Sequence, residues 1–326
     1  MAYGPHCPAI GWSDRGIRGG TVLTPGRVGS RYRRMVSVLC AGHVNWDVTL
    51  RVDRLPEPDG EASIHSQRQS GGGSAANVAV ALARQDAAAT LIGSVGDDDN
   101  GLLAKRTLRQ AGVDLAGVIE VPDAETAVKY LLVDDEGQVS VLGNDGVNEA
   151  VEPADVDPAL IQSVEHVHLT SQRPETADAI AQIAVEAGIP VSFDPGRRFG
   201  HRDYERTLSM AELVFVTERE VRAASGDVRS MVDPACTVVV TAGEEGATIY
   251  TASETVEHPG FDVEPVDATG AGDAFAAGFV ATVRRGGDLS EALAYANACG
   301  ALTAQCNGAR SAPDREAVAA FLDRQS

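Results

Sequence analysis

The sequence predicts an α/β fold with a mostly parallel central sheet and a smaller β-structure beside it, and one observation supports each part. From Met35 onward, short apolar runs alternate with helical patterns, most regularly after Val164. Alternation of this kind forms right-handed crossovers between parallel strands. Two polar segments, at about 60–70 and 125–143, do not match a sheet that is buried on both faces. We expect them to form a small β-structure that covers one edge of the main sheet.

The elements follow one another without a long linker or an internal repeat. The first expected strand is the apolar run 36–41, and an alternating run follows at 48–52. The next elements are a helix from the glycine-rich stretch 71–73 to about Arg84, a strand at 89–95, a helix at 101–111, and a hairpin of 126–133 and 138–142. The later elements are a strand near Val167, a helix through Ala187, strands at 191–194, 213–216 and 237–241, and a helix that starts at Glu218.

The first 34 residues differ from the rest of the chain. They contain six arginines and one acid, Asp14, and have no periodic apolar pattern. A targeting segment is one interpretation, but the stretch lacks the continuous apolar region of a secretory signal. We therefore expect a disordered basic extension over residues 1–34 and one folded domain over residues 35–326.

The composition excludes several classes of partner. The formal net charge is −20, with 47 acids against 27 bases, and only Lys105 and Lys129 are lysines. Nucleic acid and anionic membranes repel such a chain, so neither is an expected partner. An acid-rich, lysine-poor surface instead suggests a halophilic protein that stays soluble at high salt. The five cysteines form no Cys-x-x-Cys pair, which predicts reduced thiols, a cytoplasmic location and no zinc site.

A glycine loop at 267–273 has the features of a phosphate site. Small residues at Gly270, Ala271 and Gly272 let the backbone turn tightly and bring its amides close to a ligand. A helical pattern follows at once, and a helix N-terminus attracts anions. Asp273 lies in the first turn, where it could act as general base for phosphoryl transfer. A helix-capping acid is the plainer alternative.

Further polar residues are expected at the same edge of the sheet, because ligands of α/β proteins bind beyond the carboxyl ends of the strands. They are Asn45, Asp47, Asn77, Asp194 and Glu220. The chain has no Gly-x4-Gly-Lys-Ser/Thr motif, and no Gly-x-Gly-x-x-Gly follows the first strand. A phosphate site here must therefore use backbone amides.

From Met35 to about Leu322 the chain resembles the PfkB, or ribokinase-like, family of carbohydrate kinases. Two separated blocks carry the resemblance: 72–77 through 93–97 matches the N-terminal signature, and 267–275 matches the C-terminal one. The loop Gly42-His-Val-Asn-Trp-Asp47 agrees with both. The resemblance implies a ribokinase-like three-layer α/β/α fold. It also implies that the polar strands at about 60–70 and 125–143 form a lid over the sugar and pair between subunits of a homodimer.

The resemblance also implies roles for matched residues at the site of transfer. Asp273 would be the catalytic base, and the amides of Gly270, Ala271 and Gly272 would form the anion hole. The residues expected to contact acceptor hydroxyls are Asn45, Asp47, Gly72, Gly73 and Asn77. Loop capping by Asp47 and a helix-start hydrogen bond by Asn77 are the alternatives.

ATP and Mg²⁺ are the implied cofactors. The residues expected near the nucleotide are Thr241, Gly243, Gly246 and Asn297. Glu220, in Thr217-Glu-Arg-Glu, aligns with the glutamate that orients Mg²⁺ through water in the family's Asn-x-x-Glu motif, although Thr217 replaces the asparagine. Asp267 would correspond to a monovalent-cation site, which adds K⁺ as a candidate. A surface-helix position for Glu220 and a packing role for Asn297 are the alternatives.

The acceptor is the least determined part of the prediction. Several basic residues lie in segments expected near the acceptor pocket: Arg68, Lys129, Arg173 and Arg197. In a chain so poor in bases they favour an anionic acceptor, such as ribose 1-phosphate, a fructose phosphate or 2-keto-3-deoxygluconate. If they are instead exposed partners of acids, ribose or a nucleoside fits. A non-catalytic sugar-sensing protein is the alternative from another class, and the presence of Asp273 disfavours it.

Overall fold

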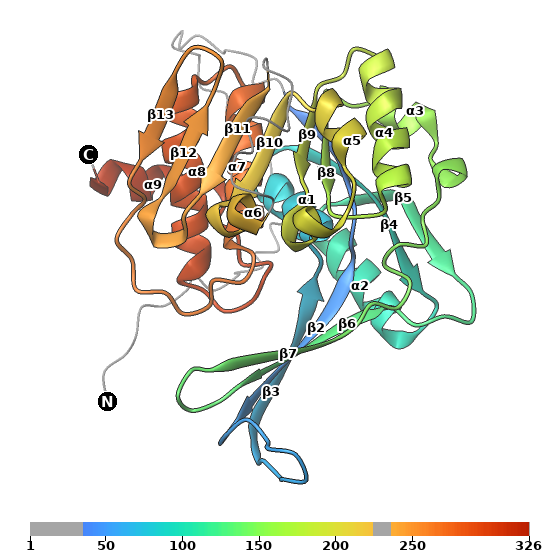
Figure 1. Ribbon diagram of the computed structural model, residues 1–326, viewed down its shortest axis with the longest axis vertical. Coiled ribbons are helices and arrows are strands. Elements are labelled where there is room, and N and C mark those ends of the chain that lie inside the picture. The colour runs from blue at the N-terminus through green and yellow to red at the C-terminus, as the bar shows by residue number, and fades with distance from the viewer. Residues whose placement is uncertain (1–34, 224–235, 326) are drawn as a thin grey trace, which may run out of the picture.

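A nine-stranded sheet forms the centre of the computed structural model, which describes residues 35–223 and 236–325 (Figure 1). Its strands are β1 (Ser37–Ala41), β4 (Ala88–Gly96), β5 (Asp114–Val121), β8 (His166–Thr170), β9 (Val191–Asp194), β10 (Leu213–Thr217), β11 (Thr237–Thr241), β12 (Ala247–Tyr250) and β13 (Thr255–His258). The order is β13-β12-β11-β10-β9-β8-β1-β4-β5. The expected extension at 1–34 lies outside the described residues.

All neighbouring strands from β11 to β5 pair in parallel, and only β12 and β13 are antiparallel to their neighbours. The prediction of a mostly parallel sheet is therefore confirmed. The bounds of β9 and β11 are those expected from the sequence. Neither β5 nor the β12–β13 pair was predicted, because none of the three has the continuous buried apolar run of the central strands.

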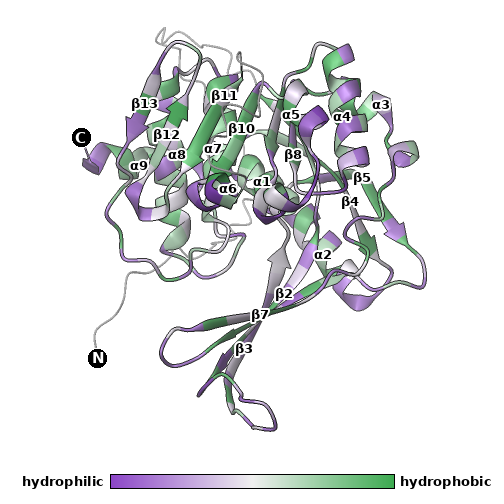
Figure 2. Ribbon diagram, in the orientation of Figure 1, coloured by the Kyte–Doolittle hydropathy of each residue, from purple (hydrophilic) through white to green (hydrophobic). Residues whose placement is uncertain are grey.

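Helices cover both faces of this sheet. One face carries α1 (Ser74–Arg84), α2 (Asp99–Gln110), α7 (Ala271–Arg284), α8 (Leu289–Ala304) and α9 (Arg315–Gln325), and the other carries α3 (Pro158–Gln162), α4 (Pro174–Glu186), α5 (Glu205–Met210) and α6 (Glu218–Ala223). Side chains of β1 alternate between the two cores, with Val38 and Cys40 in one and Leu39 and Ala41 in the other. Figure 2 shows the apolar strands between helices whose outer faces are polar. The result is the expected three-layer α/β/α arrangement.

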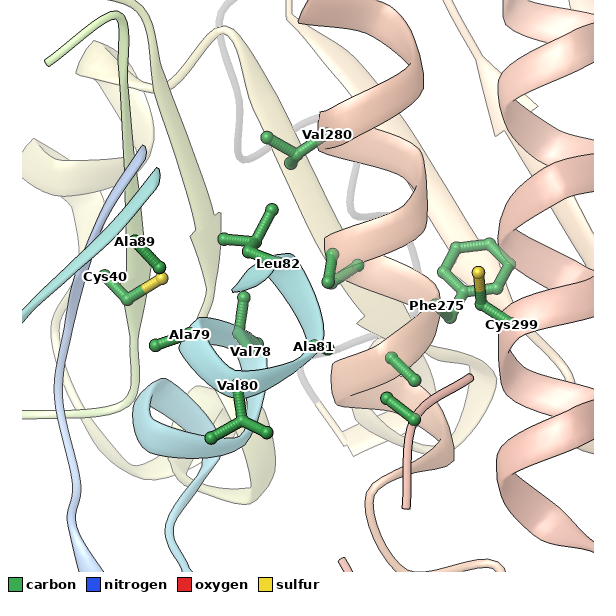
Figure 3. Packing of buried hydrophobic residues seen from close by; sticks show 14 of the residues in the cluster. Cys40, Val78, Ala79, Val80, Ala81, Leu82, Ala89, Phe275, Val280 and Cys299 are labelled. Atoms are coloured by element: carbon green, nitrogen blue, oxygen red, sulfur yellow. The ribbon is translucent and has the colours of Figure 1, made fainter. Parts of the chain in front are cut away.

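The packing of α1 against α7 positions the site described below. Helix α1 lies between the strands that carry Cys40 and Ala89 and the helix that carries Phe275 and Val280 (Figure 3). Eight of the eleven residues of α1 are buried, and many of them are alanines. Small side chains let the two helices approach closely. The first turns of α1 and α7 are thereby brought to the same end of the sheet.

A second, four-stranded sheet projects from the main body (Figure 1). It has the order β3-β2-β6-β7, and its strands are β2 (Asn45–Val52), β3 (Ile64–Gly72), β6 (Ala127–Val133) and β7 (Val139–Asn144). The polar segments and the hairpin expected at 126–142 lie in it. The run at 48–52 also belongs to it as part of β2, a placement that the sequence did not predict. No helix among the described residues is long and apolar enough to cross a membrane.

Candidate active site

A cleft of about 1480 Å³ lies between the small sheet and the carboxyl ends of the main strands. Alternate residues of β2, β6 and β7 line it, because every second side chain of a strand points to the same face. The expected site residues that line the cleft are Asn45, Asp47, Arg68, Gly73, Asn77, Lys129, Arg197, Glu220, Thr241, Asp267, Gly270, Gly272 and Asp273. Chain segments far apart in the sequence therefore meet in one cavity.

Asp273 lies in the first turn of α7 and is held by α1. Asn77 Nδ2 donates a 2.8 Å hydrogen bond to Asp273 Oδ2. Burial raises the pKa of Asp273 to about 6, although the hydrogen bonds from Asn77 and Ser74 and the charge of Arg310 oppose this. The carboxylate is therefore more basic than an ordinary aspartate, yet it is still ionised at neutral pH.

The glycine loop before α7 requires its glycine at position 270. Gly270 has φ 82°, and a Cβ there would lie 2.1 Å from the carbonyl oxygen of Ala309. The left-handed residue starts α7 abruptly, and the first amides of a helix have no partner within it. Gly272, the next glycine, lines the cleft. This combination can hold an anion with backbone amides alone.

Asp47 is a buried acid with spare hydrogen-bonding capacity. It is 9% exposed, and within the described part of the chain no donor reaches its Oδ1. Burial raises its pKa to about 6, while Arg310 and Lys129 act in the opposite direction. A Cβ at Gly72 would lie 2.2 Å from Asp47 Oδ2, so Gly72 makes room for this carboxylate. Such an unpartnered acceptor suits hydroxyl groups of a ligand.

Arg310 is the site residue that sequence reasoning missed. Its guanidinium donates to Asn77 Oδ1 at 3.3 Å, to Thr107 Oγ1 at 3.0 Å and to the Gly72 carbonyl at 2.9 Å. Its charge also lowers the pKa values of both Asp47 and Asp273. The one available signal was the scarcity of basic residues in this chain, which makes each arginine a candidate.

Asp267 is already engaged by the protein. Its Oδ1 accepts from the Thr269 amide at 3.0 Å, and its Oδ2 accepts from the Gly308 amide at 2.9 Å. Arg68 completes the set with an NH2–Oδ2 ion pair of 3.3 Å. Arg68 thus neutralises an acid of the glycine loop.

Glu220, in α6, and Asp194, at the end of β9, supply further carboxylate oxygens to the cleft. Glu220 Oε2 accepts from the Thr217 amide at 2.8 Å, and the Glu220 amide donates back to Thr217 Oγ1 at 3.2 Å. Thr217 thus acts as a helix cap, which accounts for threonine in this motif. Burial raises the pKa of Asp194 to about 8, with further contributions from Glu220 and Asp273.

These oxygens fit Mg²⁺ rather than a metal held by protein alone. No group of three His, Cys, Asp or Glu residues in the described ranges could hold a metal ion. Mg²⁺ usually takes only one or two carboxylates, together with water and nucleotide phosphates. Asp194 and Glu220 meet that requirement.

Several expected residues are described but do not line the cleft. They are Gly72, Ala271, Gly243, Gly246 and Asn297. Gly243 is exposed next to Thr241, while Gly246 forms a turn at φ 87° against the His258 carbonyl. The amide of Asn297 donates to the Leu293 carbonyl of its own helix at 2.8 Å. The structure therefore gives Asn297 a helix-internal partner and Gly246 a turn.

The basic residues expected near the acceptor differ in their surroundings. Lys129 and Arg198 both contact Asp145, which follows β7. Arg197 is exposed and has no ion-pair partner among the described residues. Arg173 lies away from this cleft, beside a smaller cavity of about 710 Å³. Sequence reasoning thus named Lys129 but missed the partner Arg198.

Comparison with known proteins identifies the family of the chain. A model of the pfkB family of carbohydrate kinases matches residues 35–316. The chain is 63% identical over 295 residues to an ATP-dependent ribose-1-phosphate kinase of Halopiger xanaduensis, which covers 89% of this chain and 99% of the relative. A nucleoside kinase of Methanothermobacter thermautotrophicus is 30% identical, over 87% of this chain and 95% of that protein.

Solved structures show the same architecture. A ribokinase of Thermotoga maritima superposes with a TM-score of 0.81 at 25% identity, over 89% of this chain and 99% of that one. An Arabidopsis thaliana ribokinase in complex with ribose and ATP also has a TM-score of 0.81, at 24% identity, over 88% of this chain and 98% of that one. The ribokinase-like fold predicted from the sequence is therefore confirmed. The chain belongs to the pfkB family of carbohydrate kinases and is a phosphotransferase with an alcohol group as acceptor.

Proposed function

We propose that this enzyme transfers the γ-phosphoryl group of ATP to a hydroxyl of ribose 1-phosphate. The observation that carries the proposal is the 63% identity to a ribose-1-phosphate kinase over nearly the whole of that protein. The basic side chains of the cleft agree with an anionic acceptor. Ribose and nucleosides are less suitable, because they would leave this positive charge without a ligand.

Asp273 is the proposed base for the acceptor hydroxyl. Its raised pKa, near 6, keeps it ionised at neutral pH and gives it more affinity for a proton than an ordinary aspartate. The hydrogen bonds from Asn77 and Ser74 orient the carboxylate, which lines the cleft where the hydroxyl would bind. As the oxygen attacks the γ-phosphorus, its proton passes to Asp273 and the bond to the β-phosphate oxygen breaks, which releases ADP.

The amides at the start of α7 are the proposed anion hole. Amides of Gly270, Ala271 and Gly272 would receive the charge that spreads over the transferring oxygens. Asp47 would accept hydrogen bonds from two neighbouring hydroxyls of the sugar, with Asn45 and Asn77 beside it. This arrangement leaves the primary hydroxyl of ribose 1-phosphate, the least hindered one, for transfer.

Cations complete the proposal. Asp194 and Glu220 would hold Mg²⁺ through water, and the ion would supply neutralisation of phosphate charge. Asp267 remains the candidate for K⁺. A monovalent ion there would have to share this carboxylate with Arg68, which already forms an ion pair with it.

The small sheet is proposed to act as a lid and as a dimer interface. Its exposed apolar side chains that do not line the cleft are Ile64, Tyr130 and Leu142, and the last two are register partners. An apolar group of this kind on a projecting sheet suits pairing with a second copy. We also propose that the enzyme is cytoplasmic, because its five cysteines form no Cys-x-x-Cys pair, and halophilic, because its net charge is −20.

A panel of acceptors tests the function. Purified enzyme would be assayed with ATP and Mg²⁺ at high KCl against ribose 1-phosphate, ribose, fructose 6-phosphate and inosine, and the product phosphate position would be determined by NMR. We expect ribose 1-phosphate to give the highest kcat/KM and a bisphosphate product. A neutral pentose or nucleoside that outruns every anionic acceptor would overturn the proposal.

A variant of the base tests the mechanism. Asp273→Ala should reduce turnover at least ~1000-fold while ATP binding, measured by calorimetry, stays within a few fold. Asp323→Asn, which removes an exposed carboxylate on α9, is the matched control and should leave turnover unchanged. Substantial residual activity of Asp273→Ala would remove Asp273 from the base role.

A further inference from the structure

Five charged side chains form one ion-paired cluster, of which Lys129, Asp145 and Arg198 line the cleft and the other two line the smaller cavity. We call it the basic wall: Lys129, Asp145, Glu149, Arg198 and Arg202. Three of its members are cations and two are carboxylates, so the cluster has a net positive charge. In a chain of net charge −20, such a concentration of bases at a ligand cleft is notable. A positively charged wall attracts and holds an anion.

The two carboxylates of the basic wall are held very differently. Glu149 is 20% exposed and is gripped by Arg202 through two hydrogen bonds, of 2.8 and 3.0 Å. Burial alone would raise the pKa of Glu149, but hydrogen bonds from His43 and Arg202 and the charge of Arg198 lower it to about 2. Glu149 is therefore a permanent part of the wall, and Arg202 is its structural partner.

Asp145, in contrast, is held loosely. It is 61% exposed, and its carboxylate contacts Lys129 Nζ at 2.5 Å and Arg198 NH2 at 3.4 Å. It lies in a turn next to Gly146, which has φ 44°. Exposed ion pairs of this kind contribute little free energy. A stronger anion could therefore take both cations from Asp145.

The position of the two cations fits the far end of a sugar phosphate. Lys129 is the register partner of Asp47 in the parallel pair of β6 and β2, so the two side chains lie on the same face of neighbouring strands, which are about 4.8 Å apart. Arg198, from the segment after β9, contacts the same carboxylate of Asp145 as Lys129 does, and its NH1 also lies 3.3 Å from His43 Nε2. A sugar whose hydroxyls bind Asp47 would thus direct a phosphate substituent toward Lys129 and Arg198.

We propose that Lys129 and Arg198 bind the phosphate group of the acceptor and that Asp145 occupies the same two cations until the acceptor replaces it. The inference rests on the proposed function and adds the residues that distinguish a phosphorylated sugar from a neutral one. Asp145 also has a role in specificity. A neutral sugar has no charge with which to displace Asp145 from the two cations. A phosphate can displace it, because it offers both cations a doubly charged group with three acceptor oxygens.

Binding of inorganic phosphate to the full-length protein tests the inference directly. Calorimetry at one fixed KCl concentration would compare the wild type with Lys129→Met, Arg198→Gln, Asp145→Asn and Arg206→Gln. The two cation variants should weaken phosphate binding at least ~10-fold, since each removes a charged hydrogen-bond donor. Asp145→Asn should strengthen it several-fold, because the competing anion is gone. Arg206→Gln removes an exposed arginine outside the cleft and should change binding less than ~2-fold.

Kinetics provide the second measurement. Lys129→Met and Arg198→Gln should lower kcat/KM for ribose 1-phosphate ~10- to 100-fold while changing kcat/KM for ribose less than ~3-fold. Asp145→Asn should lower KM for ribose 1-phosphate. Lys129 pairs only with Asp145 among the described ion pairs, so Lys129→Met remains informative if Arg198→Gln destabilises the fold.

The outcomes separate the inference from the proposed function. Unchanged phosphate binding in Lys129→Met, or weaker binding in Asp145→Asn, would overturn the inference whatever the enzyme phosphorylates. Equal losses of ribose and ribose 1-phosphate turnover would also overturn it. A wild-type enzyme that binds phosphate as expected but does not phosphorylate ribose 1-phosphate would refute the proposed function and leave the assignment of Lys129 and Arg198 supported.

Discussion

Replacement of Arg310 by methionine is expected to change the pH dependence of catalysis as well as the stability. Arg310 joins three parts of the site through its bonds to Asn77, Thr107 and the Gly72 carbonyl. Burial already lowers the pKa of its guanidinium to about 10, with the charges of Asp47 and Asp273 acting against that shift. Methionine keeps the length of the side chain and removes the charge and all three donors.

The size of the effect follows from these contacts. A buried group left without its partner costs about 1–3 kcal/mol, and removal of one member of a buried charged network costs about 3–5 kcal/mol. We expect Arg310→Met to lose about 3 kcal/mol of unfolding free energy. The charge of Arg310 lowers the pKa values of Asp47 and Asp273, which burial has raised to about 6. Without Arg310 both values rise further, so more of each acid is protonated at pH 6–7.

The assay is a profile of kcat/KM against pH from 5 to 9, together with thermal melts. The wild type should lose activity as the pH falls through about 6. In Arg310→Met this limb should move upward by about one pH unit, which corresponds to ~1.4 kcal/mol. Arg84→Met is the matched control, because Arg84 donates to the Ala312 carbonyl, two residues beyond Arg310, and its replacement leaves the Arg310 charge and its three hydrogen bonds in place. An acid limb at the same pH in Arg310→Met and wild type would refute the reasoning.

Three further predictions concern the loop, the metal side of the cleft and the core. Gly270→Ala should reduce turnover at least ~100-fold by steady-state kinetics, because its Cβ would meet the Ala309 carbonyl. The control is Gly112→Ala, at φ 85° in open space, which should cost only ~1 kcal/mol of stability in a thermal melt and leave turnover unchanged. Asp194→Asn should raise the Tm by a few degrees at pH 8 but not at pH 4 in nucleotide-free and magnesium-free buffer. Burial raises the pKa of Asp194 to about 8, so its ionised form opposes folding above the unfolded pKa. Burial also lowers the pKa of His168 to about 4, so the folded state binds fewer protons and loses stability as the pH falls from 6.5 to 4; His168→Phe should make the fall in Tm over that range less steep.

Much of the fold could be predicted from periodicity alone. Apolar runs bounded by turns identified β9 and β11 at their observed bounds, since both strands are central and buried. β5 was missed because an edge strand with a partly exposed pattern resembles loop sequence. The membership of β2 in the small sheet could not be read from its sequence, because alternation indicates a half-buried strand but not its neighbours.

The site was predictable where local backbone chemistry defined it. The glycine loop at 267–273 has a sequence signature, and the structure has a left-handed Gly270 at the start of α7. Arg310 and Arg198 had no such signature, because the groups that they bind, Asn77 and Asp145, are more than 50 residues away in the sequence. Sequence gives the residue types, whereas charge pairing depends on the three-dimensional arrangement.

The position of β1 inside the main sheet, between β4 and β8, has a consequence for synthesis. Ser37–Ala41 pairs on one side with residues 88–92 and on the other with residues 166–169, so this strand lacks one neighbour until the ribosome has made β8. Pairings of such long sequence separation slow folding. Until then an apolar strand has an open edge that can recruit other chains. Nascent or truncated chains that end before β8 should therefore aggregate. We do not expect the N-terminal half of the protein to fold on its own.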